Sequence, residues 1–448
     1  MLRQLVISGL LAAFALPSAA RTRPHYGGTL RVEIEGEPWQ RPDGIARRLV
    51  LDGLTVLDAA GAVHPALATQ WDSDGGDHRW QFRLRPGVHF HDGSPLTSVA
   101  AVAALNAACP SNCPWTAIRA VGSSVVFTSD APMPNLPALL AGDQFLIALT
   151  VGADGKTPAG NTGTGPFTVA GFNNGVLTLT ANDACWQGRP FVDAIEIHVH
   201  RSVHDQWLDL GMGRADLVEV PAEQIRQAQQ QRLTLALSPP LTLLALQVSD
   251  TGALSNPMLR AAIAQAIDRG ALHNVIFQKQ GEITAALLPQ PLSGYGFLFS
   301  TERDINKAHE LRGGLAAPPL TFAVSGGSAI QLAAQRIALN LHEAGFAVQA
   351  SSTPGAQAQL TLRTVPIAGA GNAGTLESLL RAFGESDPVI AQTPAALYKT
   401  ERDFLARHTI IPLLDLPRAW AIGARVRDLH LGAGGAPDLA SVSLEDVP

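Results

Sequence analysis

Residues 81–97 read QFRLRPGVHFHDGSPLT, and this stretch decides the fold. Apolar and polar side chains alternate over residues 80–85, the period of two that is typical of a half-buried strand. A Pro-Gly pair interrupts the alternation, which resumes with Val88 and Phe90. Asp92-Gly93 then indicates a tight turn, because glycine accepts positive φ without a steric clash. The stretch predicts strands separated by turns.

The same stretch resembles a signature of the family 5 extracellular solute-binding proteins, the peptide and nickel receptors of bacterial ABC importers. The matching positions are Phe82, Leu84, Arg85, Gly87, Val88, Phe90, His91, Asp92, Gly93, Pro95, Leu96 and Thr97. Thr97 can cap a helix through its hydroxyl. Ala100 stands where the family usually has the acidic residue that completes a capping box, so this cap is expected to be weak.

A second stretch, residues 256–269, also resembles the family. Asn256 is a good N-cap, and Pro257 occupies the first position of the predicted helix. The apolar positions of one helix face are Leu259, Ile263 and Ile267. Residues 256–269 are similar to a helix of the family that begins near an Arg-x-Ala motif and ends near Ala-Ile-Asp-Arg.

The resemblance implies an α/β fold of the periplasmic binding protein type (type II, similar to cluster C), with two large lobes and a smaller inserted lobe. The expected parts are a signal peptide (1–20), lobe I (21–45, 163–240 and 412–448), an inserted small lobe (46–162) and lobe II (241–411). The large lobes are expected to close about crossings near residues 163 and 241. Gly163 and Gly165 are the expected hinge, because glycine can absorb backbone rotation.

The first residues predict export. Arg3 precedes an apolar stretch over residues 5–16, which is shorter than the roughly 20 residues that span a bilayer. Ser18 and Ala20 supply small side chains for cleavage after Ala20. The mature protein is expected in the periplasm if the source is Gram-negative; an uncleaved anchor is the alternative.

Composition narrows the class of protein. The chain has 448 residues, more than one core usually supports, so several lobes are expected. Its net charge is −6, only 16% of its residues are charged, and it has no long basic run, which disfavours binding of nucleic acid. A hydrophobic fraction of 46% and a mean hydropathy of +0.13 disfavour disorder. A monomer is expected.

The three cysteines are Cys109, Cys113 and Cys185. Cys109 and Cys113 lie four residues apart in CPSNCP, and an exported chain meets oxidising conditions, so a disulfide between them is one interpretation. Free thiols and a metal site are the alternatives. Cys185 is expected to be a buried, inert thiol.

Three residues are candidates for ligand binding in a cleft between the large lobes. Glu37 can pair with a cationic group, and Trp39 can stack on a ligand or offer a cation–π face; a solvated loop is the alternative for both. Gln247 matches a position where the family frequently has Asn, and its amide either contacts a ligand or caps a turn.

Other motifs do not predict chemistry. The pairs His89/His91 and His198/His200 could present two imidazoles from a strand, but structural roles are the expectation. The glycine-rich run 369–374 lacks the Lys-Ser/Thr of a phosphate loop and is interpreted as a flexible loop. No nucleophile has a base and an orienting group beside it. We therefore expect neither an enzyme, a metal nor a cofactor.

Residues 360–390 depart from the family. Peptide receptors that the chain resembles usually carry an aromatic residue and an Asp here, and that Asp receives the peptide ammonium. In this chain the first acidic residue is Glu377, and neither Trp nor Tyr is nearby. The expected ligand is therefore a peptide or another, more apolar solute, and the expected partner is an ABC permease. A sensor or assembly module without a transport role is the second hypothesis.

The signal sequence gives a testable prediction. Exported protein should begin at Arg21, because the small residues that end at Ala20 suit the signal peptidase. Intact-mass spectrometry of the exported chain measures this directly. A chain that retains Met1 would contradict cleavage.

Overall fold

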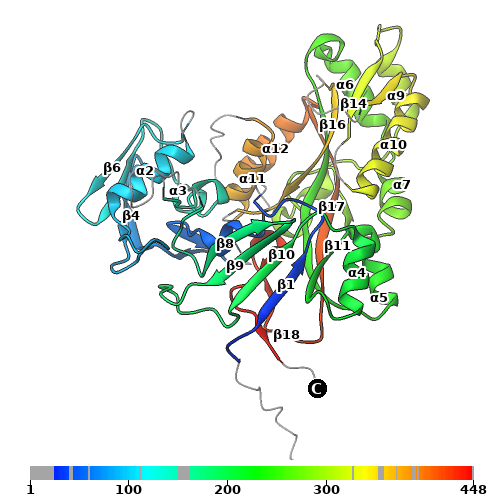
Figure 1. Ribbon diagram of the computed structural model, residues 1–448. Coiled ribbons are helices and arrows are strands. Elements are labelled where there is room, and N and C mark those ends of the chain that lie inside the picture. The colour runs from blue at the N-terminus through cyan, green and yellow to red at the C-terminus, as the bar shows by residue number, and fades with distance from the viewer. Residues whose placement is uncertain are drawn as a thin grey trace, which may run out of the picture.

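The structure is a computed structural model that describes residues 25–39, 44–58, 61–109, 113–149, 161–324, 327–351, 358–369, 371–385, 390 and 393–445. One eleven-stranded mixed sheet runs through it (Figure 1). Its order is β15 (Val348–Ser351), β14 (Leu320–Ala323), β16 (Leu360–Pro366), β12 (Thr234–Val248), β17 (Ile410–Ile422), β11 (Leu217–Val220), β1 (Thr29–Glu33), β10 (Ala194–His198), β9 (Val176–Ala181) and β8 (Phe167–Asn173), and β13 (Glu282–Ile283) also pairs with β17.

Two long antiparallel strands, β12 and β17, lie at the centre of this sheet and join its halves. Their register extends from the pair Thr234–Ile422 in one half to Gln247–Ile410 in the other. The ladder is irregular around the pair Pro240–Pro417. Proline has no backbone N–H to donate, so these positions interrupt the hydrogen bonds between the two strands.

Lobe I is built on the half that contains β1 and β8–β11. Helices α4 (Val203–Gly211) and α5 (Ile225–Gln230) pack on one face (Figure 1). On the other face, helix α1 (Arg47–Val50) and the C-terminal segment cover a core that includes Leu30, Val32 and Trp420. That segment forms two short pairs, β18 (Val426–Arg427) with β21 (Ser443–Leu444) and β19 (His430–Leu431) with β20 (Pro437–Asp438).

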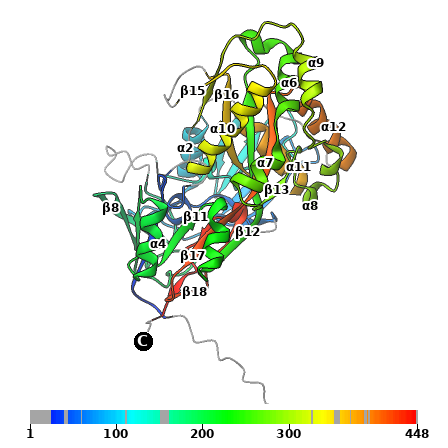
Figure 2. The same ribbon diagram turned by 90° about the vertical axis from the view of Figure 1, so that its right-hand side faces the viewer.

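Lobe II is built on the half that contains β14–β16, with helices on both faces (Figure 2). One face carries α6 (Pro257–Ala266), α7 (Arg269–Ala271), α9 (Ile305–Arg312) and α10 (Ser328–Glu343), and the other carries α8 (Gln290–Ser293), α11 (Gly371–Ala382) and α12 (Pro394–Leu405). The predicted start of α6 is confirmed, because the Asn256 side chain accepts a hydrogen bond from the Met258 amide at 2.9 Å.

The small lobe has a sheet of its own, in the order β4 (Ala68–Ser73), β5 (Arg79–Leu84), β7 (Ser124–Thr128) and β6 (Ala117–Val121). Helices α2 (Ser98–Ala108) and α3 (Leu136–Leu139) and the hairpin of β2 (Thr55–Leu57) and β3 (Val63–Pro65) complete it. The strand predicted from the alternation is β5, and Thr97 caps α2 by accepting from the Ala100 amide at 3.1 Å. The boundaries expected for the three lobes stay a prediction.

His91 joins the small lobe to lobe I. Its Nε2 donates to the Gly165 carbonyl at 3.0 Å, and its Nδ1 accepts from the Gly163 amide at 3.3 Å. The ring is therefore held neutral, and burial lowers its pKa. Beside it, Asp52 accepts hydrogen bonds from Thr164 and Trp186, at 2.8 and 2.9 Å.

The predicted hinge at Gly163 and Gly165 is not where the structure places a crossing between the large lobes. A Cβ on Gly163 would lie 2.0 Å from the Val50 carbonyl oxygen, and one on Gly165 would lie 2.7 Å from that of Leu49. These glycines allow close backbone packing where the chain returns from the small lobe. The chain passes between the halves of the large sheet through β12 and β17 instead.

Two further expectations are settled by the structure. Cys109 and Cys113 form a disulfide, and Cys185 is a buried free thiol, as one interpretation of the sequence held. The flexible loop expected at 369–374 is wrong from Gly371 onward, because α11 begins there. Burial of Leu376 and Leu379 in the core of lobe II outweighs the low helix propensity of the glycines.

A buried acid in the central strand gives a prediction. Burial, with the nearby carboxylates of Glu282 and Glu401, raises the pKa of Asp415 to about 8. The native chain then binds this proton more tightly than the unfolded chain, so the free energy of unfolding should fall as the pH rises from about 4 to 8. Asp415→Asn removes the titrating group. Urea unfolding measures the difference in the free energy of unfolding between Asp415→Asn and the wild type. This difference should be smallest near pH 4 and should favour the variant by about 1 kcal/mol or more at pH 8.

Asp250→Asn is the matched control, since Asp250 is exposed just after β12. An advantage of Asp415→Asn that is the same at every pH would contradict the prediction.

Candidate functional site

The carboxyl ends of parallel strands from the two large lobes meet at one place. In lobe I, β1 runs parallel to β10 and β11; in lobe II, β14 runs parallel to β15 and β16. A Cβ on Gly327, at the start of α10, would lie 3.6 Å from Glu35 Oε2 in the loop after β1. Ligands of open α/β sheets bind beyond the carboxyl ends of the strands. We therefore take this meeting of the lobes as the candidate site.

Glu37 lies in the loop that follows β1, and 59% of its side chain is exposed. Its Oε1 is 3.0 Å from Nε2 of His200, which follows β10 and has a φ of 56°. This pair ties together the loops after two neighbouring parallel strands. The carboxylate of Glu37 is therefore at the surface of the site, where a cation can compete with the imidazole for it.

Trp39 has a different position. It is partly buried and packs against the core of lobe I. The ring therefore contributes to the fold, whereas the sequence left open a ligand contact or a solvated loop.

Charged groups lie behind these loops. Arg201 donates to Asp209 Oδ2 at 2.5 Å, and its Nε is 3.6 Å from Glu33 Oε2. Glu33 is only 4% exposed, and its pKa is raised to about 6, mainly by burial and by the charge of Asp209. Burial, with the charge of Glu35, also raises the pKa of Glu223, which follows β11. The lobe I side of the site is therefore acidic, with Arg201 and His200 as partial compensation.

The structure places Gln247 in lobe II, level with the carboxyl end of β14. Gln247 lies in β12 and pairs with Thr361, near the amino end of β16. Thr361 in turn pairs with Ala323, the last residue of β14, so Gln247 lies two strands away from the carboxyl end of the strand that leads to Gly327. The Gln247 side chain accepts a hydrogen bond from Arg363 Nη1 at 3.2 Å. A contact between this amide and a ligand stays a prediction.

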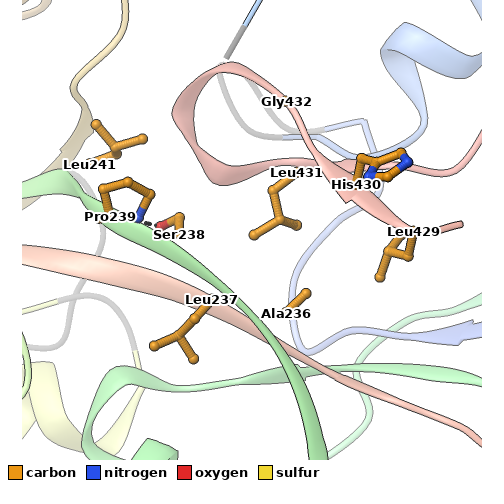
Figure 3. A pocket seen from close by; sticks show the side chains of 9 residues that line it. All are labelled: Ala236, Leu237, Ser238, Pro239, Leu241, Leu429, His430, Leu431 and Gly432. Carbon is orange, nitrogen blue, oxygen red and sulfur yellow. Dashed lines mark hydrogen bonds between the residues drawn. The ribbon is translucent and has the colours of Figure 1, made fainter. Parts of the chain in front are cut away.

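A hollow of about 330 Å³ lies beside the crossing of β12 (Figure 3). Residues 236–239 and Leu241 line one side, and residues 429–432 of the C-terminal segment line the other. The Ser238 side chain hydrogen-bonds to backbone groups that the interrupted ladder leaves unpaired. Its Oγ accepts from the Arg418 amide at 2.9 Å and donates to the Pro239 carbonyl. The crossing is thus loosely packed on one side.

No chemistry beyond binding is indicated by the described side chains. His91 is engaged by backbone groups, and His200 pairs with Glu37. Within the described ranges, no three residues of the types His, Cys, Asp and Glu are grouped so that they could hold a metal ion.

The sequence matches a known protein family. The model of the "Bacterial extracellular solute-binding proteins, family 5 Middle" matches residues 62–375, more than half of the chain. The chain belongs to this family.

Solved structures agree with the family in fold. DppA from Helicobacter pylori, in complex with the peptide STSA, has a TM-score of 0.78 at 19% identity, over 94% of this chain and 99% of that one. AgaA from A. tumefaciens R10, in complex with agropinic acid, has a TM-score of 0.79 at 19% identity, with the same coverage. NikA from Staphylococcus aureus, in complex with Ni(L-His)2, has a TM-score of 0.75 at 15% identity, over 93% and 100%. Identities this low establish the fold alone.

Curated relatives match over shorter stretches. The uncharacterized protein YhjP of Bacillus subtilis is 30% identical over 166 residues, which cover 35% of this chain and 28% of YhjP. The HTH-type transcriptional regulator SgrR of Pectobacterium atrosepticum is 30% identical over 183 residues, 39% of this chain and 32% of SgrR. The chain thus matches less than a third of the length of these relatives. In the part of the chain that the structure describes, helices are too short or too polar to cross a membrane.

The positions of Glu37 and Trp39 predict that only the substitution of Trp39 lowers stability. Glu37→Ala should leave the melting temperature of the unliganded protein nearly unchanged, because the side chain is exposed. Trp39→Ala should lower the free energy of unfolding by about 1–3 kcal/mol, because it removes part of a packed core. Thermal and urea unfolding measure both. Equal effects of the two substitutions would contradict the assignment of Trp39 to the core.

Proposed function

We propose that this chain is the substrate-binding protein of an ABC importer. After export and removal of residues 1–20, it captures a peptide or another small solute between lobes I and II in the periplasm. It then delivers the solute, as a monomer, to a permease in the inner membrane. The observation that carries this proposal is its membership of family 5 together with the meeting of the two lobes at the carboxyl ends of their parallel strands.

The closing motion is proposed to centre on β12 and β17. Among the described residues, the strands β12 and β17 carry the chain between the halves of the large sheet, and both have a proline at the crossing. The interrupted ladder and the hollow in Figure 3 leave room for these strands to twist. Residues 237–242 and 416–418 are the proposed hinge, and the crossing expected near residue 241 falls among them.

The acidic side chains of lobe I favour a solute with a cationic group. Glu35 and Glu37 supply negative charge at the surface of the site. In segment 360–390, however, Glu377 already pairs with Arg381 and is not free to receive a peptide ammonium. Free-amine peptides are therefore expected to bind weakly.

A sensor or assembly module is the second candidate function. The observation that favours it is the match to SgrR, a protein named as a transcriptional regulator. An importer component should respond to a solute and contact a permease, whereas an assembly module should do neither.

Ligand screening tests the proposal. A true ligand binds the closed, folded form better, so it should raise the melting temperature and reduce the radius of gyration measured by small-angle scattering. The first set is a library of small cationic solutes and free-amine di- and tripeptides. Glu37→Ala should weaken binding of any hit about tenfold, the loss expected for one charged hydrogen bond.

Tight binding of a free-amine peptide would contradict the interpretation of segment 360–390. If no solute in a broad library changes either quantity, the importer proposal fails and the second candidate function gains support.

A further inference from the structure

The small lobe touches lobe II directly. Gly61, beside β3, has a φ of +79°, and a Cβ on it would lie 2.7 Å from the carbonyl oxygen of Gly369 in lobe II. Asn135, just before α3, donates from Nδ2 to Glu377 Oε2 in α11 at 3.0 Å. Helix α3 packs against α11 around this bond. The two contacts fall on one short segment of lobe II, residues 369–381.

Glu377 is held from both sides. Its Oε1 accepts from Arg381 Nε at 3.3 Å and from Nη2 at 3.1 Å, while its Oε2 accepts from Asn135. Only 14% of the Glu377 side chain is exposed. Hydrogen bonds to an ionised group in such a place are among the stronger ones in proteins. The first acidic residue of segment 360–390 is therefore engaged within the protein.

The two contact points belong to one rigid body. The Thr55 hydroxyl of β2 donates to the Pro137 carbonyl, which joins the hairpin to α3. The bonds of His91 and Asp52 fix the small lobe to lobe I. A motion that separates lobe II from lobe I must therefore also break the contacts at Gly61 and Asn135.

We propose that Asn135–Glu377 and Gly61–Gly369 form a latch that holds lobe II closed in the absence of a ligand. The latch rests on the closing motion proposed above. It stabilises the closed form through contacts within the protein, independently of a ligand. It shifts the ligand-free population toward the closed form without locking it. The ligand-induced contraction of the wild type is correspondingly small.

A reversal of the hydrogen bond tests the latch. Asn135→Asp places a carboxylate against that of Glu377, so the ligand-free protein should open and its radius of gyration should rise. Adding Glu377→Gln should bring the radius back, because the new amide can donate to the new carboxylate. Asn174→Asp is the matched control: it makes the same change in the exposed turn between β8 and β9, away from lobe II, and should leave the radius unchanged.

The latch is wrong if folded Asn135→Asp has the radius of the control, or if Glu377→Gln does not reverse its expansion. Should Asn135→Asp fail to fold by circular dichroism, Asn135→Ala removes the donor without repulsion, and a radius equal to that of the control would then overturn the proposal. No ligand is added in these measurements. A failure of every solute to bind therefore leaves their outcome unaffected.

Discussion

The antiparallel pair of β12 and β17 is the constraint on which the rest of the structure depends. These strands place lobes I and II on one continuous sheet, so the lobes share backbone hydrogen bonds and are not two separate bodies on a linker. Any change in their relative orientation must be taken up as twist and bending of this pair. The prolines at residues 240 and 417 favour one place for this change, because the ladder is interrupted there; a further irregularity lies between Leu244 and Ala245.

In the described parts of the chain, the small lobe is attached to lobe I by side-chain hydrogen bonds and close backbone packing, and not by a shared sheet. A neutral imidazole, a buried carboxylate and two glycines without room for a side chain fix the return of the chain. Arg85 adds a cation–π contact, with its guanidinium carbon 4.5 Å from the centre of the Trp186 ring. The signature around His91 therefore encodes a rigid junction. Because the small lobe is fixed to lobe I, a contact between the small lobe and lobe II also constrains the position of lobe II relative to lobe I.

Much of the local structure could be predicted from the sequence, because neighbouring residues decide it. Thr97 and Asn256 cap their helices through bonds to amides two or three residues away. The alternation at Val88 and Phe90 predicted their burial correctly, but a second strand there is wrong. Turns on both sides reverse the chain before a ladder can form, and only the isolated bridge His89–Pro95 remains.

The candidate site could be predicted only in part, because it is assembled from segments far apart in the chain. The loop with Glu35 and Glu37 was found from its place after the first strand. Glu223 and the start of α10 carry no local signal, since their role depends on which strand ends meet. Strand direction in a mixed sheet is set by connections that span the whole chain.

The position of β17 has a consequence for biosynthesis. This strand inserts between β12 and β11, yet it is the last long strand in the sequence. Until residues 410–422 have left the ribosome, the centre of the sheet is missing, and β11 and β12 both present unpaired edges. Such edges invite association with other chains. The order of elements therefore implies that the large sheet can be completed only after β17 has been synthesised.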